Sequence, residues 1–347
     1  MPQPTGDRVR PVTLSDVARA AGVSQSTASR AFNGSARRVD EALKQKVLDA
    51  AARLNYVPNT QAQAVARGTT TTVALLVSDI ADAYFSSMAA AMMQEAESAG
   101  LRVSIIVTER RIEREIEVVR ELRGQHARGI VLAGSGYRHA TLTEGLRREL
   151  EMFIEAGGRV VLVSRGDLPF ESVDFDNFGG ARQLGASLAR LGYRDFLVLG
   201  GEPDLVSTQD RVAGFRSGLS DAGVDLAEDR IISSAFSWEG ARDALHRVSD
   251  DVLASTRLVF AVNDEMALGA IAALRGRGFR IPEDISVAGF DDIRTLRDVV
   301  PGLTTVHVPI DEVAHDVVAR IASGEPGAES TVLPTSVALR DSTPRLN

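Results

Sequence analysis

The 347-residue sequence contains no cysteine, only 5% aromatic residues and no apolar run of 18 or more residues. Without cysteine the chain forms no disulfide and no thiolate metal site, which fits a cytoplasmic protein. Without a long apolar run no membrane-spanning helix is expected. The first residues contain proline, glycine and arginine but no apolar segment of the kind that a secretory signal needs, so we expect no export.

The motifs of common enzyme classes are also missing. Gly134-Ser135-Gly136 follows an expected strand but is not completed to G-x-G-x-x-G, so the sequence does not predict a dinucleotide site. There is no P-loop lysine motif and no G-x-S-x-G elbow. The five histidines are scattered without the spacing of metal ligands. We therefore expect no enzymatic activity, no cofactor and no metal.

Length and charge divide the chain into a head and a body. At 347 residues with 44% hydrophobic content, two or three folded domains are expected. Residues 1–71 contain ten basic and five acidic side chains, whereas the remainder contains 29 basic and 42 acidic ones. A basic head on an acidic body suits a head that meets a polyanion while the body stays away from it.

Residues 13–33 read as two short helices joined by a glycine turn. Thr13 and Asp16 can form an N-terminal cap, and apolar residues follow with the spacing of one helix face. Ser24 can begin a second helix that runs to about Asn33 and presents short hydrogen-bonding side chains with one cation. That mixture suits base edges and phosphates in a major groove, although an ordinary helical hairpin with a polar face is the alternative. The polar face comprises Gln25, Ser26, Thr27, Ser29 and Arg30.

A third helix and a short conditional helix complete the head. Residues 1–12 are expected to be an unstructured lead. A helix over about 41–54, with Leu43, Val47, Ala50, Ala51 and Leu54 on its inward side, makes a three-helix bundle possible. Asn59–Arg67 predicts a further helix of about two turns, which is too short to be stable alone in water. Its narrow apolar face suits close packing in a dimer and insertion into a minor groove, or the segment is a plain interdomain linker. The small side chains of this face are Ala62, Val65 and Ala66.

From residue 72 the sequence alternates strand-like apolar runs with helical patterns. About nine strands, from 73–77 to 285–290, are joined by helices, among them helices over 86–99, 209–222 and 239–249, which predicts parallel sheets covered on both faces. A break near 165–171 favours two βαβ halves over one open sheet. The tail adds a helix over 310–322 and two short strands. The expected fold is an all-α helix-turn-helix head followed by a two-lobed α/β body, each lobe a parallel sheet covered by helices.

Ligands of such sheets bind beyond the carboxyl ends of the strands, where this sequence has aromatic and hydrogen-bonding side chains. Aromatic faces with planar donors and acceptors suit a small polyhydroxyl or ring-shaped ligand. Turn chemistry is the competing explanation at each single position, since Asn263 or Asp264 can simply cap the helix that follows. The residues concerned are Tyr84, Phe85, Phe236, Trp238, Arg165, Asn263, Asp264 and Asp291.

The motifs along the chain then match one family. From about Val12 to Pro344 the chain resembles the lactose-repressor/galactose-repressor family of bacterial transcription regulators, through V-T-L-S-D-V-A-R-A-A-G-V-S-Q-S-T-A-S-R-A-F-N and L-N-Y-V-P-N in the head. The resemblance covers over nine-tenths of the chain. The matching body motifs are R-V-A-G-F (211–215), N-D-E-M-A-L-G-A (263–270), I-P-E-D-I-S-V-A-G-F-D-D (281–292), L-T-T-V (303–306) and L-R-D-S-T-P (339–344).

The resemblance implies a domain order. A helix-turn-helix domain over 13–57 precedes a hinge helix and linker over 58–71, and 72–344 forms an effector-binding and dimerisation domain similar to sugar-binding periplasmic proteins. That domain is expected to have two lobes joined by three crossing segments. The implied N-lobe is about 72–164 and 303–323, the C-lobe is about 172–290 and 336–344, and the crossings lie near 165–171, 291–302 and 323–336.

For DNA the resemblance implies a homodimer whose paired heads read a pseudo-palindromic operator in double-stranded DNA. The hinge helix, which matches Asn59–Arg67, is implied to order on DNA and to wedge the minor groove. Val65 stands where leucine is common in the family, so insertion is expected to be shallower. The implied base contacts are Gln25, Ser26 and Arg30, and the implied phosphate contacts are Thr13, Ser24, Thr27, Asn33 and Tyr56.

For the effector the resemblance implies a site between the lobes, with Arg211 as the clamp on the ligand. Ser164 stands where the family often has aspartate, which removes an acceptor for sugar hydroxyls. Leu205 and Ser207 depart from the polar set of purine-responsive members, which disfavours a purine. C-terminal tetramerising heptads are absent, so a dimer is expected. The implied effector residues are Tyr84, Phe85, Ser164, Arg165, Ser207, Arg211, Phe236, Asn263 and Asp291.

The sequence therefore predicts a cytoplasmic, nucleoid-associated regulator with no membrane partner. Its expected function is sequence-specific DNA binding as a repressor of a carbohydrate-use operon, controlled by a small-molecule effector that is a sugar or a sugar derivative. A solute-binding protein without DNA function is one alternative, which residues 13–67 argue against. An α/β enzyme acting on sugars is another, but the sequence offers no nucleophile or acid–base pair for it.

Overall fold

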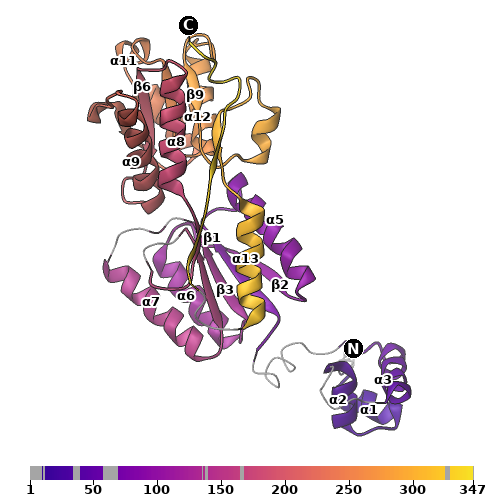
Figure 1. Cartoon of the computed structure of the whole chain (residues 1–347). Helices are drawn as coiled ribbons and strands as arrows, with labels where there is room; N and C mark the ends of the chain where they lie inside the picture. The colour runs from indigo at the N-terminus through magenta and orange to yellow at the C-terminus, as the bar shows by residue number, and fades with distance from the viewer. Residues whose placement is uncertain are drawn as a thin grey trace, which may run out of the picture. The chain divides into compact units, whose positions relative to one another are not determined.

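The computed structural model describes residues 10, 12–33, 40–57, 69–134, 136, 140–164, 168–324 and 329–346. The chain divides into two compact units, the head Met1–Thr70 and the body Thr71–Asn347 (Figure 1). The predicted hinge helix Asn59–Arg67 lies outside the described residues. Among the described helices, none combines the length and the apolarity that a bilayer crossing requires.

In its described residues the head is a bundle of three helices, α1 (Leu14–Ala21), α2 (Gln25–Asn33) and α3 (Glu41–Arg53). Its small core joins one apolar face of each helix. Leu43 was expected in this core but is 38% exposed, because the eight-residue α1 and nine-residue α2 are too short to cover the first turn of the thirteen-residue α3. The buried residues are Val17, Ala18, Ala28, Ala31, Val47, Ala50 and Ala51.

The sequence signals for the ends of α1 act as predicted. The Thr13 hydroxyl accepts from the backbone N–H of Asp16, and the Asp16 carboxylate accepts from the backbone N–H of Thr13 at 3.0 Å, which completes a capping box. Gly22 ends the helix with φ 67°, a left-handed conformation that glycine adopts without strain. Asp40 caps the N-terminal end of α3, where its carboxylate accepts from the N–H groups of Ala42 and Leu43. These local contacts fix the helix boundaries of the head.

The body contains two four-stranded parallel sheets, which confirms the predicted fold class. The first has the order β2-β1-β3-β4 and the second the order β7-β6-β8-β9. The strands of the first are β1 (Thr72–Val77), β2 (Arg102–Val107), β3 (Gly129–Ala133) and β4 (Arg159–Val163); those of the second are β6 (Phe196–Gly201), β7 (Ile231–Ser233), β8 (Leu258–Ala261) and β9 (Ser286–Ala288).

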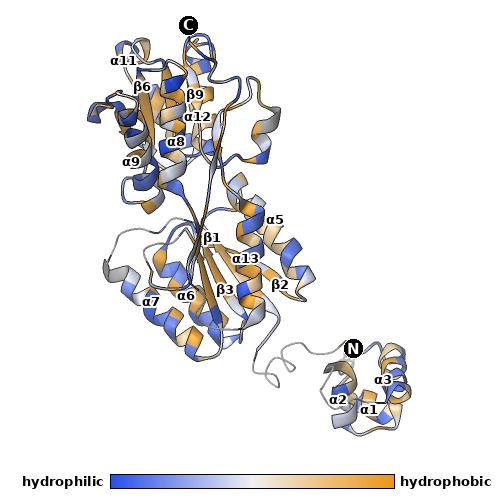
Figure 2. Cartoon of the chain, viewed as in Figure 1, coloured by the Kyte–Doolittle hydropathy of each residue, from blue (hydrophilic) through white to orange (hydrophobic). Residues whose placement is uncertain are grey.

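Helices cover both faces of each sheet because the strands are apolar on both sides. In β1, Val73, Leu75 and Val77 belong to one core cluster, whereas Ala74 and Leu76 belong to another. Figure 2 accordingly shows β1 and β3 in hydrophobic colours. Four helices pack in two pairs around the first sheet: α5 (Ala83–Ser98) with α13 (Ile310–Ser323), and α6 (Ile112–Gly124) with α7 (Ala140–Glu155). Four more pack in two pairs around the second sheet: α8 (Asn177–Arg190) with α9 (Val206–Asp221), and α10 (Trp238–Arg247) with α12 (Asp264–Gly276).

The chain passes between the two sheets three times (Figure 1). It leaves β4 for α8, leaves β9 for α13, and returns from α13 to the last strand. Short strands line these passages: β5 pairs in parallel with β11, and β10 pairs antiparallel with β12. Their bounds are β5 (Val173–Phe175), β10 (Thr305–His307), β11 (Thr331–Leu333) and β12 (Ser336–Ala338).

Several boundaries differ from those expected. Helix α5 begins at Ala83 instead of 86, because Asp82 accepts from the N–H of Tyr84 and caps the helix there. The single helix expected over 239–249 is two helices, α10 and α11 (Asp250–Ala254), because Ser249 has extended backbone angles and caps a new helix. Two 3₁₀ turns, η1 (Glu228–Arg230) and η2 (Arg294–Asp298), were not predicted.

Candidate functional site

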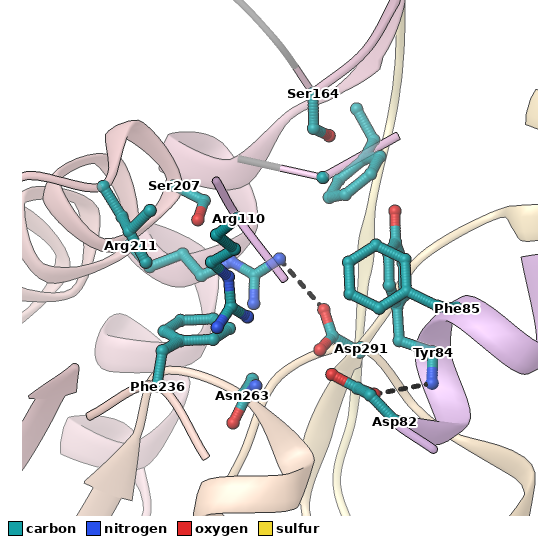
Figure 3. A pocket seen from close by; sticks show the side chains of 13 residues that line it. Asp82, Tyr84, Phe85, Arg110, Ser164, Ser207, Arg211, Phe236, Asn263 and Asp291 are labelled. Carbon is teal, nitrogen blue, oxygen red and sulfur yellow. Dashed lines mark hydrogen bonds and ion pairs between the residues drawn. The ribbon is translucent and has the colours of Figure 1, made fainter. Parts of the chain in front are cut away.

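A pocket of about 420 Å³, counting the part open to solvent, lies where the ends of both sheets converge (Figure 3). Every strand of the two sheets is followed by at least one lining residue, as expected for ligands of parallel sheets. The lining residues are Asp82, Tyr84, Phe85, Arg110, Gly134, Ser164, Phe175, Leu205, Ser207, Arg211, Phe236, Asn263 and Asp291.

The structure brings eight of the nine predicted effector residues together in this pocket. The ninth, Arg165, lies outside the described residues. Trp238 and Asp264, which also follow strands, do not line the pocket. Arg110 and Phe175 also line the pocket and were not predicted there. Asp82, Gly134 and Leu205 follow strands, as expected of lining residues, but were not among the named effector residues.

Arg211 is the best-anchored side chain of the pocket. It projects from α9, is 4% exposed, and uses its guanidinium on three separate elements. The Nε group donates to Oδ1 of Asn177 at 2.7 Å, Nη1 donates to the carbonyl of Val262 at 2.7 Å, and Nη2 lies 2.9 Å from Oδ1 of Asp291. Its Cζ lies 3.9 Å from the centre of the Phe290 ring. A planar guanidinium held on this many sides has one orientation, which suits it to position a ligand.

Asp291 is the ion-pair partner of Arg211 and has an unusual backbone conformation. It is 5% exposed and has φ 115°, a region that L-residues rarely occupy. Burial raises the pKa of its carboxyl to about 7, against the opposing charge of Arg211. Asp291 lies at the start of the passage from β9 to α13 and also lines the pocket, so this passage and the pocket share one residue.

Aromatic rings form one wall of the pocket. Tyr84 and Phe85, at the start of α5, make an edge-to-face pair with ring centres 5.1 Å apart, and Tyr84 also lies 6.3 Å from the Phe175 ring. A Cβ atom at Gly134 would lie 3.0 Å from Cζ of Phe85, so glycine lets this ring approach the end of β3. The Tyr84 hydroxyl is buried without a hydrogen-bond partner among the described residues, which leaves it available to a ligand.

Asn263 both caps a helix and lines the pocket, which the sequence had offered as alternatives. Its Oδ1 accepts from the N–H of Met266 at 2.8 Å and caps α12, while its amide lines the pocket. Asp264 instead supports the passage after β9. Its carboxylate accepts from the Thr305 hydroxyl at 2.7 Å and from the N–H of Ile293 at 3.0 Å, with no exposed surface.

Two charged residues enter the pocket from the first sheet. Asp82 caps α5, and burial raises the pKa of its carboxyl to about 6. Arg110 follows β2 and holds its Cζ 5.1 Å from the centre of the Phe236 ring, which belongs to the segment after β7 (Figure 3). This cation–π contact joins residues that follow different sheets.

The head presents its predicted contact residues on and beside α2. Gln25 and Ser26 are exposed in its first turn, and Thr27, Ser29 and Arg30 are half-buried. The Ser24 hydroxyl accepts from the N–H of Thr27 at 3.1 Å.

Side chains in the head also bond to one another. Nη2 of Arg30 donates to the Ser26 hydroxyl at 3.3 Å, and the Thr13 hydroxyl donates to Oδ2 of Asp16 at 2.6 Å. The Tyr56 ring lies 5.7 Å from Phe32, so its ring belongs to the head core. Asn33 is the last residue of α2. The predicted hinge contacts Asn59, Ala62, Val65 and Ala66 lie outside the described residues.

Comparison with known proteins matches both units. Residues 13–59 match the family described as bacterial regulatory proteins, lacI family, and residues 186–343 match a periplasmic binding protein-like domain. The chain is 30% identical over 341 residues to the HTH-type transcriptional regulator DegA of Bacillus subtilis (strain 168), over 96% of this chain and 99% of that protein. It is 31% identical over 345 residues to the HTH-type transcriptional regulator CelR of Thermobifida fusca, over 97% and 99%.

A solved structure supports the same relationship. The lac repressor dimer bound to operator and the anti-inducer ONPF aligns with TM-score 0.82 at 27% identity, covering 96% of this chain and 100% of that chain. The resemblance inferred from the sequence motifs is thereby confirmed. The chain belongs to the lacI family of bacterial regulatory proteins and is a DNA-binding transcription regulator, not an enzyme.

Proposed function

We propose that this regulator represses an operon for carbohydrate use and that a small polyhydroxyl effector in the body pocket controls its binding to DNA. A homodimer binds a pseudo-palindromic operator in double-stranded DNA through its paired heads. It acts in the cytoplasm, on the nucleoid. CelR, which is 31% identical, supports a sugar effector, because a solved structure is described as the CelR-cellobiose complex.

The observation that carries this proposal is the position of the pocket. Its lining comes from segments that follow the strands of both sheets, and Asp291 belongs to a passage between them. A ligand in this place contacts both halves of the body at once. It therefore has a different affinity for each relative arrangement of the two halves, and only such a difference can shift a conformational equilibrium.

The proposed DNA contacts follow from exposure and chemistry on α2. Gln25 and Ser26 are exposed at its N-terminal end and carry the amide and hydroxyl groups that suit base edges. Arg30 lies one turn further along the same helix. In the free head its guanidinium is occupied by Ser26, so contact with a base exchanges an intrahelical bond for one to DNA.

The proposed dimer uses the edge of the first sheet. Strand β2 is the edge strand, and its residues Ile105 and Val107 are 37% and 38% exposed. Met93 on the neighbouring α5 is 51% exposed. A second copy of the chain that covers these apolar side chains gains hydrophobic burial.

The proposal is tested by DNA release. An operator is selected from a randomised duplex pool, labelled, and titrated with the full chain while sugars and sugar derivatives are added. We expect at least one compound to change the DNA affinity of the wild type and to lose this effect in Phe236→Ala, which removes an aromatic ring from the pocket lining. Phe178→Ala is the matched control, because Phe178 is 43% exposed and does not line the pocket. An effector response that survives Phe236→Ala unchanged would contradict the assignment of this pocket.

A further inference from the structure

Arg110 is a pocket-lining arginine whose donors are not used by the protein. In the described part of the chain its guanidinium makes no hydrogen bond and no ion pair. It stacks over Phe236, and its charge acts on the Asp82 carboxyl without a bond between the two groups. Stacking occupies the face of the guanidinium but none of its five N–H groups, which point outward in its plane. The pocket therefore contains a cation with a full set of unoccupied donors.

Two neighbouring carboxylates form ion pairs with other arginines. Asp291 lies 2.9 Å from Nη2 of Arg211, and Glu109 lies 3.9 Å from Arg111. A third, Asp82, accepts from the N–H of Tyr84 at 2.9 Å and caps α5; the charge of Arg110 lowers its pKa, but burial outweighs this effect and raises it overall. The two arginines and two aspartates of the lining balance in formal charge, so what singles out Arg110 is the direction of its donors and not an excess of positive charge.

Two neutral polar groups of the same pocket also have no partner. The Tyr84 hydroxyl and the Ser164 hydroxyl are both buried without a hydrogen bond among the described residues. Each can donate to or accept from a ligand hydroxyl. Buried polar groups are costly when they stay unpaired, so a ligand that pairs with these two hydroxyls and with Arg110 removes that cost.

We propose that the effector carries an anionic group, a carboxylate or a phosphate, that binds the in-plane donors of Arg110 while its ring lies against the aromatic wall and its hydroxyls meet Tyr84 and Ser164. This inference rests on the proposed function above and narrows its effector to acidic sugars. Arginine binds carboxylates and phosphates through two parallel bonds, so either group satisfies the geometry.

The experiment compares matched pairs of compounds that differ in the acidic group alone. Glucose is compared with glucuronate and with glucose 6-phosphate, galactose with galacturonate, and ribose with ribose 5-phosphate, by thermal shift and by calorimetric titration of the full chain. We expect one anionic member to bind about 10- to 100-fold more tightly than its neutral partner, as for a hydrogen-bonded charged group. The carboxylate and phosphate arms distinguish the two sources of charge.

Three variants assign the effect to Arg110. Arg110→Gln is expected to bring the affinities of the pair together, and Arg110→Lys to keep part of the preference because it retains the charge without the planar fork. Arg242→Gln is the control, because Arg242 also lies 5.1 Å from an aromatic ring, that of Trp238, but does not line the pocket. The melting temperatures without ligand show whether each variant is folded.

Several outcomes would overturn the inference. They are a neutral member that binds as tightly as its anionic partner, the absence of binding by every anionic member, and an Arg110→Gln variant that weakens both members equally. The last result would make Arg110 a contact between the halves of the body. The proposed function is judged separately, by whether any compound that binds the pocket changes DNA affinity, so a neutral effector that releases DNA overturns the anionic inference alone.

Discussion

The ion pair between Arg211 and Asp291 predicts a large and non-additive loss of stability. Both side chains are at least nine-tenths buried, and Arg211 also donates to Asn177 and to the Val262 carbonyl. The perturbations are Arg211→Ala, Asp291→Asn and the two together. Arg211→Ala leaves a buried carboxylate and two acceptors without their donor, whereas Asp291→Asn leaves an amide oxygen that still accepts from the arginine.

The sizes follow from this difference. Removing one partner of a buried ion pair costs about 3–5 kcal/mol, so we expect Arg211→Ala to lose that much stability. Asp291→Asn is expected to cost roughly 1–2 kcal/mol, the scale of one weakened charged hydrogen bond. The double variant is expected to lose at least about 1 kcal/mol less stability than the sum of the losses of the two single variants, because Asp291→Asn removes the charge that Arg211→Ala leaves unpaired.

Urea unfolding of the full chain measures these values. The single tryptophan, Trp238, lies in the body, so its fluorescence reports the unit that contains the ion pair. Arg182→Ala is the control, because the Arg182–Asp221 pair has a similar distance of 2.7 Å but both side chains are about half exposed, and exposed pairs contribute little. An Arg211→Ala variant as stable as this control, or strictly additive effects in the double variant, would refute the reasoning.

Three further predictions test the head, the pocket and the dimer. Substitution of Gln25 or Ser26 is expected to change which half-site bases are preferred in a randomised-operator selection, and an unchanged preference would exclude them from base contacts. Asp82→Asn is expected to stabilise the chain by about 1–2 kcal/mol at pH 8 but not near pH 4. The pKa of Asp82 is raised to about 6, so the stability of the wild type falls as the pH rises from about 4 through 6. Asparagine does not ionise and can still cap α5. Thermal melts that show the same stability difference at pH 4 and at pH 8 would contradict this. Ile105→Asp is expected to weaken the dimer by at least tenfold in sedimentation analysis, and an unchanged association constant would place the interface elsewhere.

The elements that the sequence predicted correctly have local causes. Thr13, Asp16 and Gly22 define α1 through contacts within one helix turn, so their residue types are sufficient. Strand ends were equally informative, since Tyr84 and Asn263 reach the pocket because each follows a parallel strand. Where the signal is a cap or a strand end, local chemistry determines the position.

The residues that were missed depend on geometry that the sequence does not reveal. Arg110 reaches the pocket because it and Glu109 both have φ 54°, in a turn without glycine or asparagine. Its sequence surroundings look like the start of the next helix. Helix α9 begins at Val206, three residues before the expected 209. Its N-cap residue, Leu205, makes no side-chain hydrogen bond, so no capping signal in the sequence marks this start. Leu43 is exposed because of the lengths of neighbouring helices, which no pattern within α3 records.

Reciprocity offers the most direct test of control of DNA binding by the body pocket. A ligand that changes operator affinity by a given factor must have its own affinity changed by the operator by the same factor. Calorimetric titration of the effector into the full chain, with and without saturating operator duplex, measures this factor. We expect the two affinities to differ by the factor found in DNA-binding titrations, typically about 5- to 150-fold. Equal effector affinity with and without operator would contradict the coupling between pocket and head.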